Sequence, residues 1–437
     1  MSSTTYRPDL TLWRDITPLP QPLIKATPHS AHILVIGGGV LGLVQAWSLL
    51  DKGYRVTILA KEWASFGQSQ RLTSQISGAL WEYPPAVCGQ HTDEISLNHS
   101  KKWCMTAYHI YNGIASDPEL SKDSGIRMMP SNFYFPHHID GDLFQSGKMK
   151  EMMASGVVGF RRGLELVTEH NIDPTHGGVD AYGIMAPVID TDAAMAWLMD
   201  LVKAKGAKMV TETIHGDLLP QEDRLRYRFG ADVIINCTGL AGIETAGDET
   251  CYPIRGGLIR VINDGVDFPK VTGALTISAD AAGVNEIVFI VPRNDKILLL
   301  GGFAESDEWK LDLTLDSPVM KRMKARCESF IPGLKNARVD PTYPMAQGLR
   351  PFRRQNVRVE RELRPHISSP TKPSRIVHSY GHGGAGWSLT FGCAGDVLGL
   401  VEEALRDMPA RPTTSTRMPA PQPSRQYVPE IQIQARM

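Results

Sequence analysis

The sequence has no run of about 18 apolar residues, which is the length that a membrane-spanning helix needs. It also has no charge bias, since 46 Lys and Arg residues stand against 47 Asp and Glu residues, for a net charge of −1. The first absence predicts that no helix crosses a membrane. The second gives no electrostatic reason to expect a nucleic acid or an anionic membrane as a partner. A chain of 437 residues is long enough for about two to three domains.

Cysteine is sparse and has no metal-binding spacing. None of the six cysteines belongs to a C-x-x-C pair, so we expect no zinc site and no disulfide framework. This favours reduced thiols inside a cell, at Cys88, Cys104, Cys237, Cys251, Cys327 and Cys393. Residues 1–30 lack an apolar core and contain scattered prolines. They predict an irregular N-terminal extension, not a secretory signal.

What the sequence does have is a glycine-rich turn that directly follows an apolar run. Residues 32–36 predict a buried parallel strand. Gly37, Gly39 and Gly42 then fill the three positions of a G-x-G-x-x-G turn. The first glycine allows the tight turn, the second lets the backbone approach a pyrophosphate, and the third lets helix and strand touch.

The turn lies in the context that gives this motif its meaning. A helix over residues 43–52 and a second strand over residues 55–60 complete a βαβ unit, which predicts dinucleotide binding. We expect the phosphates at the N-terminus of the helix, beside Val40 and Leu41. An acid that binds the ribose should follow the second strand, but Lys61 stands there. Glu62 is the substitute that we expect; the alternative is a solvated glutamate.

A polar segment follows at residues 66–77, rich in Ser, Gln and Thr, and leads to Gly78-Ala79-Leu80-Trp81. Its composition suits a loop beside a bound cofactor, but it suits a plain surface loop equally well. Residues 97–114 predict a helix. A helix over residues 193–205 is predicted to begin with Thr191 or Asp192 as its N-cap.

The second half of the chain alternates between strands and helices. Residues 231–239 are an apolar strand that runs into a small-residue turn, where Cys237 is interpreted as a buried apolar side chain and not as a nucleophile. Three further runs predict strands of one antiparallel sheet, and a helix follows at residues 316–330. The three runs are residues 253–261, 286–292 and 296–303.

A second glycine turn precedes the last predicted helix. Residues 375–380 predict a strand, Gly381-His382-Gly383-Gly384-Ala385-Gly386 follows, and a helix spans residues 387–405. This turn offers further backbone N–H groups to the far end of a long dinucleotide. Beyond residue 405, the composition predicts a disordered tail.

Five separated motifs together resemble the D-amino-acid oxidase family of FAD-dependent oxidoreductases, and they occur in the family's order. They are Gly78-Ala79-Leu80-Trp81, Asn236-Cys237-Thr238-Gly239, Arg255-Gly256-Gly257, Gly348-Leu349-Arg350-Pro351 and the stretch from Ile376 to Ala394. In the last motif, Ser379 replaces the usual Asn. The resemblance implies an α/β fold, with a Rossmann-like FAD-binding domain and a second, antiparallel-sheet substrate domain.

The implied domains are discontinuous. The FAD-binding domain is expected at residues 31–100, 183–255 and 342–408, and the substrate domain at residues 101–182 and 256–341. The extension at residues 1–30 and the tail at residues 409–437 flank them.

The resemblance also implies the site residues. Arg350 matches the arginine that pairs with the substrate carboxylate, for which a planar guanidinium is suited; a surface salt bridge is the alternative. Gly384 matches the glycine whose carbonyl accepts a hydrogen bond from the substrate amine. Together with the glycine turn and Lys61 or Glu62, the implied FAD contacts are Ser77, Gly78, Ala79, Leu80, Thr238, Gly239, Gly383, Gly384, Ala385, Gly386, Trp387 and Ser388.

Two tyrosines of the family's active site are missing, because Asn285 and Phe289 stand at their positions. Ala385 also replaces a frequent tyrosine, so a roomier pocket is implied. Arg353 or Arg354 could supply replacement charge, or could be solvated or bind phosphate.

The resemblance implies an enzyme that oxidises the C–N bond of a D-amino acid or related amine with FAD as a non-covalent cofactor. The amine gives a hydride to the flavin, the imine is hydrolysed, and O2 is reduced to H2O2. One alternative is an oxidase or dehydrogenase of a larger or N-substituted amine in a specialised biosynthetic pathway. The other is a flavin-binding scaffold without turnover. A homodimer is possible, and Ala435-Arg436-Met437 is a loose variant of a peroxisomal signal, with the cytoplasm as the alternative.

Overall fold

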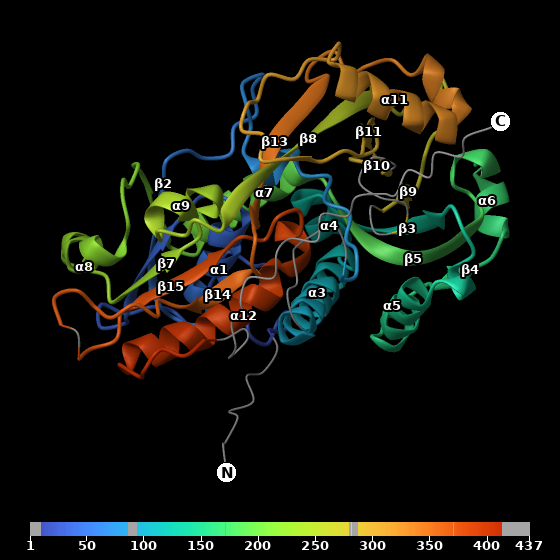
Figure 1. Ribbon diagram of the computed structural model, residues 1–437. Coiled ribbons are helices and arrows are strands. Elements are labelled where there is room, and N and C mark those ends of the chain that lie inside the picture. Colours follow the sequence, from blue (N-terminus) through green and yellow to red (C-terminus); the bar gives the residue numbers. More distant parts are fainter. Residues whose placement is uncertain are drawn as a thin grey trace, which may run out of the picture.

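The computed structural model describes residues 10–85, 94–170, 172–278, 281, 287–369 and 371–412. Two β-sheets organise this part of the chain, and helices cover them (Figure 1). The predictions for Cys88, for Asn285, for the disordered tail beyond residue 412 and for the Ala435-Arg436-Met437 tripeptide lie outside the described residues. No helix among the described residues is long and apolar enough to cross a membrane.

A six-stranded sheet is assembled from segments that are far apart in the sequence. Neighbouring strands pair in parallel, except that β14 is antiparallel to β15. The strand order is β14 (Arg358–Arg361), β15 (Ile376–Tyr380), β7 (Val233–Asn236), β1 (His32–Ile36), β2 (Arg55–Ala60) and β6 (Lys208–Thr211).

Both faces of this sheet are buried at its central strands β1 and β7, which is why these two strands are mainly apolar. Ile33 and Val35 point to a core that they share with α1 (Val40–Asp51). Leu34 and Ile36 point to the opposite face, which packs against α8 (Glu222–Phe229).

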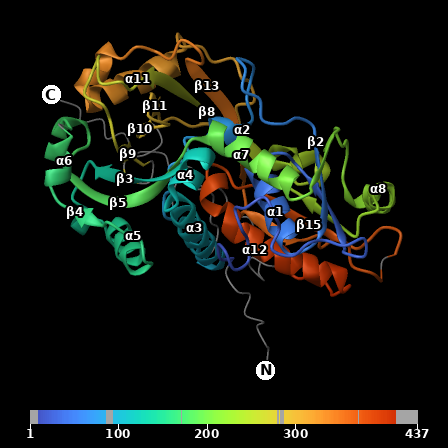
Figure 2. The same ribbon diagram turned by 180° about the vertical axis from the view of Figure 1, so that it is seen from behind.

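On the α1 side, a layer of long helices covers the sheet, as the two views in Figures 1 and 2 show. Helix α12 (Gly386–Leu405) packs on α1 and on α3 (Glu94–Ala115), while α7 (Thr191–Ala204) packs on the other flank of α1. Short helices complete this half: α2 (Thr73–Ile76), α4 (Pro118–Ser124), α9 (Gly242–Thr245), η3 (Leu219–Gln221) and η4 (Gly239–Ala241).

A larger sheet of nine strands forms the other half. All its pairs are antiparallel except the parallel pair of β3 and β9. The order is β12 (Glu305–Ser306), β8 (Cys251–Ile262), β11 (Ile297–Gly301), β10 (Val288–Pro292), β9 (Ala274–Ile277), β3 (Ile126–Phe135), β5 (Asp180–Ile189) and β4 (Arg161–Arg162), with β13 (Met345–Arg353) also paired to β8.

The two faces of the nine-stranded sheet have different neighbours. Helix α11 (Pro318–Phe330) covers one face, where Phe330 packs edge-on against Tyr134 of β3. The remaining short elements lie around the sheet edges: α5 (Leu143–Ala154), α6 (Glu165–Glu169), η1 (Ile139–Gly141), η2 (Pro174–His176) and η5 (Pro332–Asn336).

The face away from α11 is called the inner face below, and strand register defines it. Residues directly opposite each other in paired strands share a face. Phe133 of β3 lies opposite Tyr182 of β5 and Thr276 of β9, and Thr276 lies opposite Phe289 of β10. From Phe289, the strand pairing continues through β11 and β8 to β13, where the Arg350 side chain lies on the same face. The Ile76 side chain of α2 lies on this face, against Gly348. The inner face is therefore the one turned toward the α1 half.

The observed elements confirm the main sequence predictions, with one correction. The N-cap of α7 is Asp190, whose carboxylate accepts from the N–H of Asp192, so the predicted caps Thr191 and Asp192 are wrong. Three consecutive residues here can all cap a helix, and the sequence alone does not rank them.

The predicted domain limits do not coincide with element ends. They cut through α3, β5 and β8, and β13 joins the nine-stranded sheet although it was assigned to the FAD-binding segments. A sequence pattern shows that a strand exists, but it does not show which sheet the strand joins. The division into functional domains stays a prediction.

Residues 10–30 are irregular, as expected, but they are firmly packed. Leu10 and Ile16 are buried, and the Trp47 indole of α1 donates to the Thr17 carbonyl at 2.8 Å. Asp51 at the end of α1 accepts from the N–H groups of Thr17 (2.7 Å) and Leu23 (3.0 Å). The extension is therefore a strap bound to the α1 half.

Candidate functional site

The first glycine turn has the geometry that its sequence predicts. Gly37 has a φ of +126°, and a Cβ there would collide with the carbonyl of Cys237, which directly follows the neighbouring strand β7. A Cβ on Gly42 would collide with the Gly37 carbonyl. By contrast, a Cβ on Gly39 would meet only the Ser74 hydroxyl, at 3.1 Å. The turn is thus tightly packed at Gly37 and Gly42, and it leaves open space at Gly39, beside the N-terminus of α1.

The second glycine turn brings the N-terminus of α12 to the same place. Gly386 begins α12, and a Cβ there would lie 3.4 Å from the Leu41 side chain and 3.8 Å from that of Val40. Two helix N-termini therefore converge, and each favours an anion through its free N–H groups and its dipole. Such a cradle suits the pyrophosphate of a dinucleotide.

Ser74 connects the two turns and was not singled out from the sequence. Its hydroxyl accepts from the Val40 N–H at 3.0 Å, and its carbonyl accepts from the Trp387 indole at 2.9 Å. The part of the segment at residues 66–77 that forms α2 thus lies beside the two glycine turns, whereas residues 66–70 are exposed. The only sequence signal was the richness of this loop in hydroxyl groups.

The segment from Ser77 to Leu80 lies between the cradle and the inner face. The Phe289 ring presses on Gly78, where a Cβ would not fit. Ala79 has a φ of +49°, and its carbonyl accepts from the Ile189 N–H at 3.1 Å. Phe289, the residue at the position of a missing tyrosine, therefore supports this segment.

The remaining predicted cofactor positions lie around the first turn. Gly239 has a φ of +62° and follows Thr238, whose hydroxyl donates to the Asn236 side-chain oxygen at 2.8 Å. Lys61 and Glu62 are exposed at the end of β2, and a Cβ on Gly38 would lie 3.1 Å from the Glu62 carbonyl. Their proximity to the turn is established, while ribose binding stays a prediction.

Arg350 projects from β13 on the inner face. Its guanidinium lies over Gly256, where the absence of a side chain makes room for it, and its Nη1 donates over long distances to the carbonyls of Phe303 (3.4 Å) and Arg255 (3.5 Å). Neighbouring arginines are committed elsewhere: Arg353 pairs with Asp248 at 2.8 Å, and exposed Arg354 pairs with Asp307 at 2.6 Å. Both ion pairs argue against the hypothesis that Arg353 or Arg354 replaces the missing contacts.

The second turn exposes one glycine among buried neighbours. Gly384 is exposed, whereas Gly383 and Ala385 are buried, and the Phe352 ring fills the space where a Cβ on Gly383 would be. Trp387 and Ser388 are buried in the first turn of α12. Gly384 is therefore the position in this turn whose carbonyl can reach a ligand.

No histidine near this turn is suited to act as a base. His382 is buried against the Cys393 thiol, and burial lowers its pKa to about 3. Burial also lowers the pKa of His378 to about 4, although Glu362 bonds to its ring at 3.2 Å. Both imidazoles are neutral at physiological pH. Burial likewise raises the pKa of the Cys237 thiol, which donates to Gln45 and is not a nucleophile.

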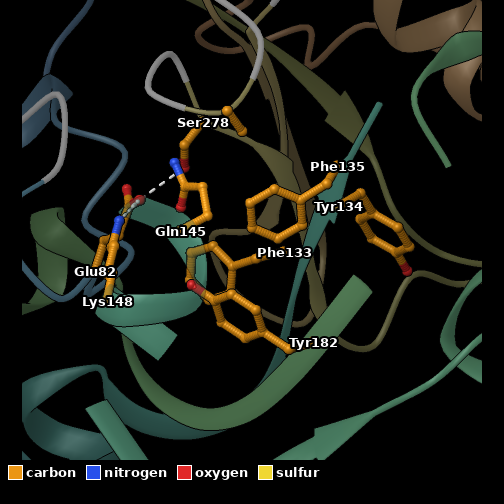
Figure 3. Close-up of a pocket in the computed structure, with 9 residues that line it drawn as sticks. Glu82, Phe133, Tyr134, Phe135, Gln145, Lys148, Tyr182 and Ser278 are labelled. Carbon is orange, nitrogen blue, oxygen red and sulfur yellow. Dashed lines mark hydrogen bonds and ion pairs between the residues drawn. The ribbon is translucent and has the colours of Figure 1, made fainter. Parts of the chain in front are cut away.

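A narrow pocket, too tight to hold a water molecule, lies on the inner face between Glu82 and the rings of β3 and β5 (Figure 3). The stacked rings of Phe133 and Tyr182, 5.1 Å apart, form one wall. On the other side, the Glu82 carboxylate accepts from the buried Lys148 ammonium at 3.3 Å and from the Ser278 hydroxyl at 2.7 Å. Aromatic and charged groups thus meet only two residues beyond the segment predicted to contact the flavin.

Comparison with known sequences confirms the resemblance. Residues 32–398 match the family described as FAD dependent oxidoreductase, and the chain belongs to this family. It is 30% identical over 375 residues to a D-amino-acid oxidase of Rubrobacter xylanophilus, covering 86% of this chain and 97% of that relative. It is 26% identical to the human D-aspartate oxidase, with 86% and 96% covered.

Solved structures show the same fold. A glycine oxidase from Bacillus cereus superposes with a TM-score of 0.62 at 13% identity, covering 88% of this chain and 100% of that one. An iminodiacetate oxidase from Chelativorans gives 0.61 at 15% identity, covering 86% and 96%. The protein is thus an FAD-dependent oxidoreductase, and the two-helix cradle fits its cofactor. Relatives such as the Rubrobacter enzyme are bacterial, so they lend no support to a peroxisomal address.

Proposed function

We propose that the protein oxidises the C–N bond of a D-amino acid or a related amine, with O2 as the electron acceptor. The observation that carries this proposal is the placement of Arg350 on the inner face, facing the half that holds the cradle. A guanidinium there binds a substrate carboxylate through two parallel charge-assisted hydrogen bonds. The exposed Gly384 carbonyl accepts from the substrate amine.

The cofactor contacts follow from the same geometry. The two helix N-termini would hold the pyrophosphate, Ser74 lies between them, and the segment from Ser77 to Leu80 would lie along the ring system. When bound, FAD takes the hydride from the substrate carbon and passes electrons to O2. The role of the chain is to position the substrate and to exclude water, and it supplies no general base. The expected homodimer also stays a prediction.

Anaerobic bleaching of the flavin tests the proposal. A panel of D-amino acids, L-amino acids and secondary amines is mixed with the holoenzyme, and air is then admitted. Bleaching by D-amino acids, with colour and peroxide appearing together in air, is the expected result. If substrates bleach the flavin but air does not restore its colour, O2 is not the acceptor.

A second candidate substrate class is a larger or N-substituted amine. Phe289 replaces a hydroxyl-bearing residue, and the aromatic wall and the Glu82–Lys148 pair lie beyond Leu80. The space between them is too small for a water molecule, so these side chains would have to move apart to admit a distal group. Glu82 is four positions after Gly78 in the chain, so the chain limits this distance to about 14 Å. Bleaching by extended amines alone, together with its loss in Glu82→Gln, would favour this candidate; bleaching by small D-amino acids would reject it.

A further inference from the structure

Arg293, directly after β10 (Val288–Pro292), is a buried cation to which no carboxylate is bonded among the described residues. Its side chain is 2% exposed. It donates from Nη1 to the Ile189 carbonyl at 2.8 Å and from Nη2 to the Ser77 carbonyl, while Nε has no partner among the described residues. Burial lowers its pKa to about 10, so it stays charged at neutral pH. A buried charge of this kind is costly unless another charge balances it.

The surrounding acids are already engaged. Asp190 caps α7 and accepts from the Asn294 amide at 2.8 Å, and Asp192 accepts from Arg71 at 2.6 Å. Two further cations, Arg127 and Arg260, also contribute to the local field. Each of these two cations has its own carboxylate: Arg127 lies 3.6 Å from Asp295, and Arg260 lies 3.1 Å from Asp340. Charges of both signs therefore surround Arg293, and Asp190 is the carboxylate that acts on it most strongly.

Arg293 also holds a junction in the backbone. The segment from Ser77 to Trp81 pairs with the end of β5, where the Ile189 N–H donates to the Ala79 carbonyl and the Trp81 N–H donates to the Pro187 carbonyl at 3.0 Å. The guanidinium bonds to one carbonyl on each side of this junction. A planar fork can join two carbonyls in this way, whereas an ammonium cannot reproduce its geometry.

We propose that Arg293 is a positioning residue for the flavin. It fixes the segment from Ser77 to Leu80 and supplies the positive charge that favours the reduced, more negative flavin. The inference rests on the proposed placement of the ring system along this segment. Because the neighbouring cations are paired with carboxylates, loss of the Arg293 charge leaves negative charge in excess beside this segment, and the reduction potential of the flavin therefore depends on Arg293.

The test compares Arg293→Met, which removes the charge, with Arg293→Lys, which keeps it. The flavin potential is measured by equilibration with a reference dye, and FAD affinity by titration of the apoprotein. In Arg293→Met we expect the equilibrium between reduced and oxidised flavin to fall by about 10- to 100-fold, a potential lower by about 30–60 mV for a two-electron couple. In Arg293→Lys we expect the potential to change by less than half as much. Both variants should bind FAD several-fold more weakly.

Arg361 is the matched control. It is fully buried in β14, donates to the carbonyls of Ser374 (2.7 Å) and Met408, and likewise has an Nε without a partner among the described residues. Met408 lies beyond the C-terminus of the 20-residue helix α12, about 30 Å along that helix from its glycine turn. Arg361→Met should lower stability as Arg293→Met does, but leave the flavin equilibrium within twofold of the wild type.

Two outcomes would overturn the inference. A change below twofold in Arg293→Met would show that its charge does not reach the flavin, and an equal change in Arg361→Met would make the effect a general consequence of lost stability. If Arg293→Met does not fold, an unchanged potential and an unchanged FAD affinity in Arg293→Lys also reject the positioning role. Leu80→Ala tests the proposed placement of the flavin separately from the role of Arg293. If this substitution alters neither the flavin spectrum nor the FAD affinity, the placement of the flavin along the segment from Ser77 to Leu80 is rejected.

Discussion

Replacing Asp51 by Asn should release the N-terminal strap and destabilise the whole α1 half. The carboxylate accepts from four donors: the N–H groups of Thr17 and Leu23, the Trp47 indole (2.8 Å) and the Lys205 ammonium (2.7 Å). The side chains of Asp51 and Lys205 are both fully buried. Removing one charge of such a pair leaves the other uncompensated, which costs about 3–5 kcal/mol. An amide also turns an NH2 group toward donors, so we expect the upper part of this range.

The free energy of unfolding is measured in urea at a fixed FAD concentration, with limited proteolysis of residues 10–30 as a local readout. The control is Asp51→Asn combined with Lys205→Met. This double variant also removes the ammonium group that Asp51→Asn leaves without a carboxylate, and it keeps an apolar side chain of similar length. The double variant should recover at least about 1 kcal/mol relative to Asp51→Asn. A loss below about 1 kcal/mol in Asp51→Asn, with the strap still protected from proteolysis, would refute the reasoning, because such a loss is typical of an exposed ion pair.

Three further predictions concern the site. Gly42→Ala should abolish FAD binding or lower it by at least about 10-fold, because the added Cβ collides with the Gly37 carbonyl; titration of the apoprotein with FAD measures this, and near-normal affinity would contradict the observed turn geometry. Arg350→Lys should lower kcat/KM for carboxylate substrates by about 10- to 100-fold, since a second hydrogen bond is lost, with little effect on amines that lack a carboxylate. Stability should fall as the pH is lowered from about 6.5 to about 3, because the folded-state pKa values of His378 (about 4) and His382 (about 3) lie below the ordinary value and the unfolded chain binds protons first. His382→Gln should make this fall less steep in urea unfolding across the same range.

Most of the correct predictions came from short sequence patterns that involve neighbouring residues. Each glycine turn occupies only a few residues between a strand and a helix, so both turns and their convergence on a dinucleotide could be anticipated before the fold was known. The helices at residues 97–114 and 316–330 followed from apolar spacing and are observed as α3 and α11. Arg350 could be placed on a strand near other family motifs, but that it lies over Gly256 depends on the register of β13 with β8.

The contacts that complete the site connect residues that are far apart in the chain, and no local pattern marks them. Ser74 is one hydroxyl among several in a polar loop, and only the fold places it between Val40 and Trp387. Asp51 resembles a solvated acid at a helix end, while its partner Lys205 is 154 residues away. Arg293 follows an apolar strand, where a surface position is the ordinary expectation for arginine. In each case a polar side chain is buried because several distant segments bring donors and acceptors to it together, so its role is a property of the assembled fold.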